Sequence, residues 1–292
     1  MDSMIHELRD VCSECTLLRE RREPPRSAPL MQRSDHEAPS VFRPQNMLRV
    51  ARRQKGLHAG DVPPLCVLDP DGDLVRFVRA RRGATRSAFW ACYHTLMWEW
   101  REGDRHYGVI GSAVGASFSV LVAEQLFVSG CRLLVSISSA GQIADASPPP
   151  FHILIERSLR DEGTSYHYLP ASTYAEADGG LVELAARAFA ASGAPVLRGA
   201  TWTTDAPFRE TAATVARRRA EGLLAVEMEA AALYAFATAG SHPILCLAQV
   251  TNQLGNGADD FEKGEENGAA LTLRLIDSFA AVWLESTTAQ VP

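Results

Sequence analysis

The sequence lacks an apolar run of the ~18 residues that a membrane-spanning helix requires, and no apolar signal-peptide core follows its first residue. It also lacks positive charge overall. Its formal net charge is −6, which argues against a general nucleic-acid surface. The hydrophobic fraction of 46% is enough for a sizeable core. These features predict a soluble, cytoplasmic protein with one large α/β domain or two small ones, and with neither nucleic acid nor membrane as a partner.

Cysteine is sparse, with six residues scattered along 292. Cys12 and Cys15 form a CxxC pair, but no second pair accompanies it, so the pattern favours neither a zinc site nor a redox site. The other four lie in apolar or aromatic settings and are predicted to be reduced core thiols: Cys66, Cys92, Cys131 and Cys246.

Residues 1–60 differ from the rest of the chain. They carry a net charge of +3, whereas the remainder carries −9, and they combine several prolines with poor apolar periodicity. We predict a basic, partly disordered N-terminal extension. An arm that docks on a neighbouring subunit is the alternative, and Met31 and Met47 are alternative natural starts that the sequence leaves open.

Apolar strand-like runs alternate with amphipathic or alanine-rich segments from residue 65 to residue 284, which predicts one α/β layer architecture. The aromatic-rich segment 88–100 is expected to be core or subunit interface. Strands are predicted at 65–68, 109–111, 133–137, 153–159, 197–203, 223–228 and 244–251, and helices at 74–79, 117–128, 180–192, 210–221 and 229–239, with a last helix ending near 284.

Two loops of small residues follow predicted strands. The first, 111–117, contains Gly115 and opens a helix, so backbone N–H groups and close ligand approach are available there. Its spacing is neither GxGxxG nor GxxxxGK[ST], which excludes the dinucleotide and P-loop interpretations. The second, 138–141 (Ser-Ser-Ala-Gly), contains Ser139 and ends a strand that is buried on both faces. Such loops are where α/β folds bind ligands.

Two acids flank Met228 where a buried strand meets an alanine-rich helix. Glu227 and Glu229 are costly at such a junction unless they have partners. Both acids suit the positive end of a helix. Alternatively, Glu229 points into a pocket and binds a polyhydroxylated ligand. The local sequence leaves both interpretations open.

Five segments, in this order, resemble the family I nucleoside phosphorylases and nucleosidases. The resemblance covers roughly residues 65–284 and implies one three-layer α/β/α domain with a mixed, distorted central sheet, at 61–288. It also implies a homo-oligomer, dimer-based or hexameric. The segments are 138–141 (Ser-Ser-Ala-Gly), 161–168 (Asp-Glu-Gly-Thr-Ser-Tyr-His-Tyr), 203–205 (Thr-Thr-Asp), 226–232 (Val-Glu-Met-Glu-Ala-Ala-Ala) and 250–252 (Val-Thr-Asn).

The resemblance implies roles for particular residues. Glu229 binds the ribose 2′- and 3′-hydroxyls, because a carboxylate accepts two hydrogen bonds from a cis-diol. Met228 packs against the ribose, Ser139 lies near the ribose and the nucleophile, and Arg209 binds the base. Asn252 stands where purine phosphorylases have an aspartic acid that protonates the leaving purine, which favours a pyrimidine. The remaining substrate-binding assignments are Glu227, Thr204, Asp205, His167 and Gly115, although His167 is more often a structural histidine in such a setting.

The chain departs from the phosphorylases at their phosphate site. Ser136 replaces an arginine of the central strand, and the acidic segment 68–73 (Leu-Asp-Pro-Asp-Gly-Asp) replaces an arginine-bearing loop. Like charges close together repel, so this loop disfavours phosphate. Arg76, Arg79 or an arginine of the extension (Arg43, Arg49, Arg52) offers compensation; otherwise the nucleophile is water, as in the nucleosidases.

The function expected first is that of a uridine phosphorylase-like enzyme, which converts a nucleoside and phosphate to free base and ribose 1-phosphate without metal or organic cofactor. An N-ribosidase of the same fold is the second hypothesis. A non-catalytic nucleoside-binding or regulatory protein is the third. The sequence does not identify the base or the 5′ substituent.

Overall fold

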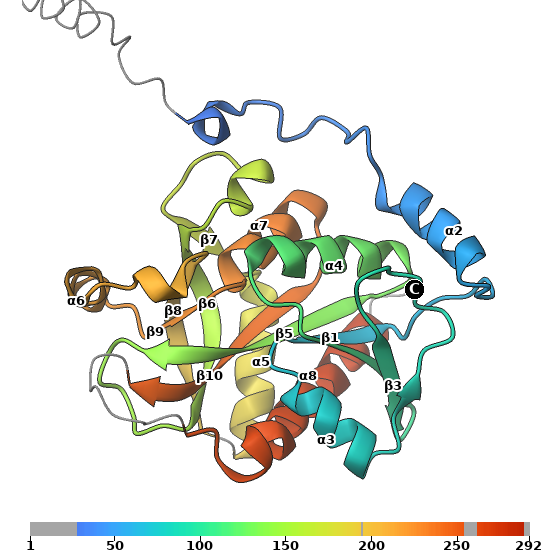
Figure 1. The fold of residues 1–292 in the computed structure, drawn as a ribbon. Helices are drawn as coiled ribbons and strands as arrows, with labels where there is room; N and C mark the ends of the chain where they lie inside the picture. Colours follow the sequence, from blue (N-terminus) through green and yellow to red (C-terminus); the bar gives the residue numbers. More distant parts are fainter. Residues whose placement is uncertain (1–27, 194, 254–261, 289–292) are drawn as a thin grey trace, which may run out of the picture. The chain divides into compact units, whose positions relative to one another are not determined.

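The computed structural model describes residues 28–193, 195–253 and 262–288. The chain divides into two units, residues 1–34 and 35–292. In the first unit the described residues include one 3₁₀ turn, η1 (Pro29–Gln32). The described part of the second unit contains seven α-helices and ten strands, so the predicted mixed α/β class is confirmed (Figure 1).

The strands of the second unit are β1 (Leu65–Asp69), β2 (Thr85–Arg86), β3 (Met97–Glu102), β4 (Arg105–Gly111), β5 (Leu133–Gln142), β6 (Phe151–Asp161), β7 (Tyr174–Glu176), β8 (Val196–Thr204), β9 (Ala225–Glu227) and β10 (Ile244–Gln253). The α-helices are α2 (Pro44–Gln54), α3 (Asp73–Arg81), α4 (Ala116–Val128), α5 (Gly179–Ser192), α6 (Ala212–Ala220), α7 (Ala230–Gly240) and α8 (Ala269–Thr288). Three 3₁₀ turns complete the set: η2 (Ser165–His167), η3 (Pro207–Arg209) and η4 (Glu265–Gly268).

The sheet is mixed, and part of it closes on itself. Its order is β10-β6-β8-β9-β5-β1-β4-β3-β2, and β10 also pairs with β5 in parallel. Strands β5, β10, β6, β8 and β9 therefore form a barrel-like ring of five. The ring is completed by two Cα pairings between β5 and the short strand β9, Gly141 with Val226 and Gln142 with Ala225.

Helices cover both faces of the sheet. One buried cluster joins the sheet to α4 and α7, and a second joins it to α3, α5 and α8 (Figure 1). Alternate residues of β1 enter the two clusters: Cys66 and Leu68 the first, Leu65 and Val67 the second. This two-sided burial explains why the strand is apolar throughout.

The parallel strands β1, β5 and β10 bring three loops to one edge of the sheet, because the carboxyl ends of parallel neighbours lie side by side. These are the turn between β1 and α3, the end of β5 at residues 138–141, and the end of β10 near Asn252. The N-termini of α4 and α7 reach the same edge, since Gly115 and Glu229 are hydrogen-bonded to each other.

Several elements differ from their predicted bounds. The aromatic segment contains a strand, β3, whose Trp100 is buried and stacks on Tyr107 of β4, with ring centroids 4.9 Å apart. The helix expected from residue 210 begins at Ala212 instead, because the hydroxyl of Thr211 caps it by accepting the N–H of Thr214.

Other features of the described residues bear on the sequence-based expectations. Within 1–60, helix α2 buries Leu48 and Ala51 beside Ala91. The four cysteines predicted to be core thiols are buried and free, whereas Cys12 and Cys15 lie outside the described residues. Among the helices described, none is both long and apolar enough to span a membrane.

Candidate functional site

Glu229 is buried, with 2% of its surface exposed, at the N-cap position of α7. Its Oε1 accepts the backbone N–H of Gly115 at 2.7 Å, and its Oε2 accepts the hydroxyl of Ser138 at 2.7 Å. Burial and the neighbouring charge of Glu227 raise the pKa of Glu229 to about 7, against the lowering effect of these hydrogen bonds. The backbone N–H of Met228 lies 3.3 Å from the same Oε2, so the carboxylate has three donors within the protein.

Glu227 has a different environment. Its Oε2 accepts the backbone N–H groups of Glu229 and Ala230, both at 2.7 Å, which satisfies two free donors at the start of α7. Its Oε1 accepts the hydroxyl of Thr203 at 2.5 Å and lies 3.2 Å from two further hydroxyls, those of Ser158 and Thr201. Burial raises the pKa of Glu227, and these hydrogen bonds oppose the rise. Its carboxylate is thus fully engaged within the protein.

The N-termini of α4 and α7 converge on this pair of acids. Gly115 is the N-cap of α4 and has φ +88° and ψ 154°, a backbone region that is almost exclusive to glycine. A Cβ at this position would lie 4.0 Å from Cε of Met228. The positive ends of two helices favour negative charge at Glu227 and Glu229, which explains how two carboxylates remain together in the interior.

A cavity of about 350 Å³ is lined by Glu227 and Met228, whereas Glu229, the next residue along the chain, does not line it. It brings together four of the residues predicted for the site: Ser139, Glu227, Met228 and Asn252. Asn252 follows an irregularity in the pairing of β10 with β5, between Val250 and Asn252, and such bulges re-aim side chains near active sites.

The other predicted residues do not line this cavity. His167 is exposed in η2, and Arg209 is exposed in η3, although both neighbours of Arg209 line the cavity. Thr204 is buried and its hydroxyl accepts the N–H of Ala206 at 3.2 Å. Asp205 accepts the N–H of Gly163 at 2.8 Å, so it braces two loops against each other.

The acidic turn after β1 carries an ion-pair network. Nζ of Lys263 lies 2.7 Å from Oδ2 of Asp71 and 2.6 Å from Oδ2 of Asp73. Asp71 also accepts the hydroxyl of Ser139, which connects the network to the cavity. Burial raises the pKa of Asp69 to about 6, and the charges of Asp73 and Asp71 add to the rise.

Three of the five arginines considered as substitute phosphate ligands contact other groups of the protein. Arg76 pairs with Asp73, Arg79 lies over the Trp98 ring at 3.9 Å, and Arg52 donates to the carbonyl of Phe89 at 3.3 Å. Ser136, at the place of the central-strand arginine, is 1% exposed, and its hydroxyl has no hydrogen-bond partner among the described residues.

Three residues of the site are not among those predicted from the sequence. Ser138 is one position before the predicted Ser139, and alternation along β5 places the two hydroxyls on opposite faces. Lys263 belongs to the polar segment 255–268, for which a solvated loop is the expectation from sequence and of which residues 255–261 lie outside the described residues. Phe208 lines the cavity and is 99% exposed, a property that no local pattern signals.

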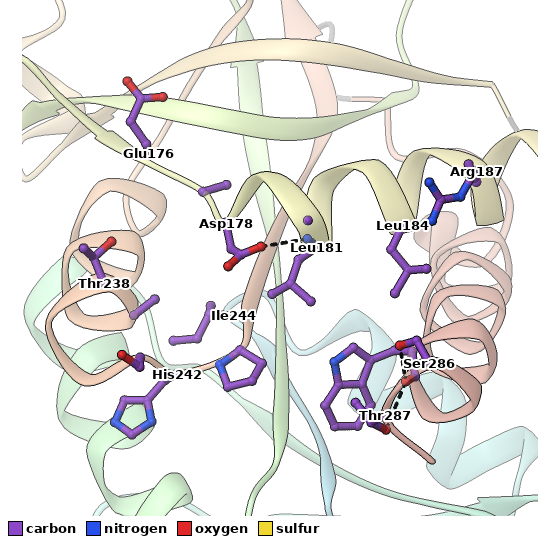
Figure 2. A pocket seen from close by; sticks show the side chains of 16 residues that line it. Glu176, Asp178, Leu181, Leu184, Arg187, Thr238, His242, Ile244, Ser286 and Thr287 are labelled. Carbon is purple, nitrogen blue, oxygen red and sulfur yellow. Dashed lines mark hydrogen bonds between the residues drawn. The ribbon is translucent and has the colours of Figure 1, made fainter. Parts of the chain in front are cut away.

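A second cavity, of about 760 Å³, opens between α5, the end of α7 and the end of α8 (Figure 2). Arg187, His242 and Trp283 are among the residues that line it. It includes Ile244, the first residue of β10, whereas Asn252 is near the other end of that strand. Eight residues of strand span about 26 Å, so this cavity is separate from Glu229.

The order of these elements and the buried acids define an α/β protein with a polar site at the carboxyl edge of its sheet. The chain matches the family model of the phosphorylase superfamily over residues 74–282, and it belongs to that superfamily. A search of curated proteins found no match.

Proposed function

We propose that this chain cleaves the N-glycosidic bond of a nucleoside and that Glu229 holds the ribose. The observation that carries the proposal is the buried Glu229 carboxylate, which accepts the backbone N–H groups of Gly115 and Met228 and the hydroxyl of Ser138, directly after Met228 in the lining of a cavity of about 350 Å³. A cis-diol provides two donors at the spacing that one carboxylate accepts, and it can replace the Ser138 hydroxyl without leaving the carboxylate unpaired. Superfamily membership supports a nucleoside as the ligand.

In the proposed reaction the bond between C1′ and the base nitrogen breaks, and its electron pair leaves with the base. The sugar acquires oxocarbenium character, as in other glycosyl transfers. Met228 packs against the ribose, and the anionic Glu229 opposes the positive charge that develops on the sugar. Asn252 and Phe208, which line the cavity, are placed to contact the base. An asparagine does not protonate a leaving purine, which favours a pyrimidine such as uracil.

Two nucleophiles are candidates. Phosphorolysis to ribose 1-phosphate is the reaction that the uridine phosphorylase-like segments favour. Hydrolysis is favoured by one specific observation, the acidic turn around Asp71 and its contact with Ser139, because that is where a phosphate ion would otherwise have to approach the sugar. On this balance of charge we propose hydrolysis.

We further propose that residues 61–288 form the catalytic domain in a three-layer nucleoside phosphorylase fold, and that the preceding residues form an extension. Helices on both faces of the sheet support this assignment. A homo-oligomer is proposed as the working form because related enzymes complete their sites with a neighbour.

The test is a panel of purine and pyrimidine nucleosides incubated with the full chain, with and without phosphate. We expect release of free base from at least one pyrimidine nucleoside, and free ribose as the sugar product. Glu229→Ala is expected to abolish release. Binding without turnover across the panel would favour a nucleoside-binding protein instead, and ribose 1-phosphate as the product would identify a phosphorylase.

A further inference from the structure

Lys263 joins a segment near the end of the chain to the turn after β1. Its ammonium contacts Asp71 and Asp73, and its side chain is only 16% exposed. Burial lowers the pKa of Lys263, but the hydrogen bonds to the two aspartates outweigh burial and raise it overall. Lys263 is therefore a cation whose charge is already used within the protein.

The contacts of Lys263 with Asp71 and Asp73 form a bridge whose position is fixed by a residue of the central sheet. The side-chain amide of Gln249 on β10 donates to the carbonyl of Lys263 at 2.9 Å and to that of Asn267 at 3.2 Å. Asn267 in turn donates to Asp73 at 2.7 Å. The position of Lys263 thus follows from contacts on both sides of its segment.

The bridge also lies next to the proposed sugar site. Asp71 accepts the Ser139 hydroxyl, and the adjacent Ser138 donates to Glu229. A group that attacks the sugar held by Glu229 from this side meets Asp71 first. Among the described residues, the aspartates at positions 71 and 73 pair with two cations, Lys263 and Arg76, and Asp69 adds a further acid two positions before Asp71, so an arriving phosphate would be repelled.

The volume available beside Asp71 also disfavours phosphate. A small, partly open cavity of about 10 Å³ lies among Asp71, Asp73, Ser138, Ser139 and Gln249. This volume is about that of one water molecule measured with a water-sized sphere, and the site has enough polar partners to hold one. A phosphate ion has five heavy atoms and is too large for this volume.

We infer that Asp71, Asp73 and Lys263 select the nucleophile, admitting water and excluding phosphate. This inference rests on the proposed cleavage of a nucleoside. The oxygen of the admitted water bonds to C1′ as the bond from C1′ to the base nitrogen breaks. The water loses one proton, the departing base gains one, and the products are ribose and neutral base. Neutralising both aspartates removes two negative charges beside Lys263 and so lowers the repulsion that an anion meets there.

The experiment compares the full chain with Asp71→Asn/Asp73→Asn, by ³¹P NMR titration of inorganic phosphate and by identifying the sugar product. The wild type is expected to show no saturable phosphate binding and to yield ribose in excess phosphate. The double variant is expected to bind phosphate at least about tenfold more tightly and to form some ribose 1-phosphate. Adding Lys263→Met is expected to remove both gains.

Two further variants keep the test decisive. Asp104→Asn/Glu176→Gln removes the same charge from exposed positions and is expected to gain nothing. Asp71→Asn alone keeps the pair between Lys263 and Asp73, and it serves if the double variant does not fold, with a smaller expected gain. Phosphate binding by the wild type, or a gain that survives Lys263→Met, would overturn the inference. If no nucleoside is cleaved, the proposed function fails, and phosphate binding still decides the role of the bridge.

Discussion

The carboxylate of Glu227 accepts the backbone N–H of Glu229 at 2.7 Å, so one acid caps the helix on whose N-cap position the other stands. The same carboxylate accepts the N–H of Ala230. Glu229 makes no capping bond of its own and turns instead toward Gly115 and Ser138. The two interpretations of the Glu-Met-Glu segment thus apply to different acids: Glu227 stabilises the helix start, and Glu229 is the acid that we propose as the ligand of the ribose.

These different roles predict that one alanine variant loses stability and that the other loses activity. Glu227→Ala leaves two backbone donors and a buried hydroxyl without their acceptor, and each such group costs about 1–3 kcal/mol. We expect a large loss in the free energy of unfolding, measured by urea denaturation. Glu229→Ala is expected to retain most of that free energy and to lose base release. Equal destabilisation by both variants would contradict the assignment.

The raised pKa of Glu229 predicts a pH dependence of both stability and activity. Between its ordinary pKa of 4.5 and about 7, the folded protein holds a proton that the unfolded chain has lost. The contribution of Glu229 to the free energy of unfolding should thus fall as pH rises through this window and level off above it. The raised pKa values of Asp69 and Glu227 act in the same direction and the lowered pKa values of His152 and His242 in the opposite one, so the contribution of Glu229 is measured as the difference between the wild type and Glu229→Gln.

Activity should change in the opposite sense, because the ionised carboxylate is the better acceptor for the ribose hydroxyls. We expect kcat/KM to rise with pH and to reach a plateau above about 7, since this profile reports the free enzyme. The difference in the free energy of unfolding between the wild type and Glu229→Gln should depend on pH below about 7 and become constant above it. A wild-type kcat/KM that is independent of pH between 5 and 8 would count against Glu229 as the sugar ligand.

The sequence predicted best what depends on local pattern. The two-sided burial of β5 and the small-residue start of α4 follow from runs of residue types, and both were confirmed. The closure of the ring through β9 was not predicted, because it rests on two backbone pairings that leave no mark on a three-residue strand. The contact of Lys263 with Asp71 joins residues 192 positions apart, and the sequence around either residue does not predict a contact with the other.

The backbone of Gly115 gives a third prediction. Alanine at this position must adopt a region that costs about 1–3 kcal/mol for a residue with a Cβ, and it shifts the N–H group that binds Glu229. We expect Gly115→Ala to lower both the melting temperature and nucleoside affinity. Gly103→Ala is the matched control, since Gly103 has φ +58° and no atom within 4 Å of an added Cβ. It should lower stability slightly and leave affinity unchanged.

Asp277 on α8 gives a prediction about stability alone. It binds Arg105 through two bonds of 2.8 and 2.9 Å and accepts the buried Tyr107 hydroxyl at 2.6 Å. Asp277→Ala leaves that hydroxyl without its acceptor, and we expect a loss of about 1–3 kcal/mol in the free energy of unfolding. The more exposed pair between Arg82 and Glu102 is the control, and Glu102→Ala should cost less than about 1 kcal/mol.

Asn252 gives the last prediction, which concerns the leaving group. Asn252 lines the cavity beside Met228, and its amide cannot donate a proton to a departing purine. Asn252→Asp introduces a group that can, and positioned general acids contribute roughly 10²–10⁴-fold. We expect the ratio of kcat/KM for a purine nucleoside to that for uridine to rise by about tenfold, most strongly at low pH, where the new carboxyl is protonated. Gln253→Glu adds an acid at the next position, which alternation turns to the other face of β10, and it should leave the ratio unchanged. An equal rise in both variants would show that added charge, rather than proton donation at residue 252, changes the preference for the base.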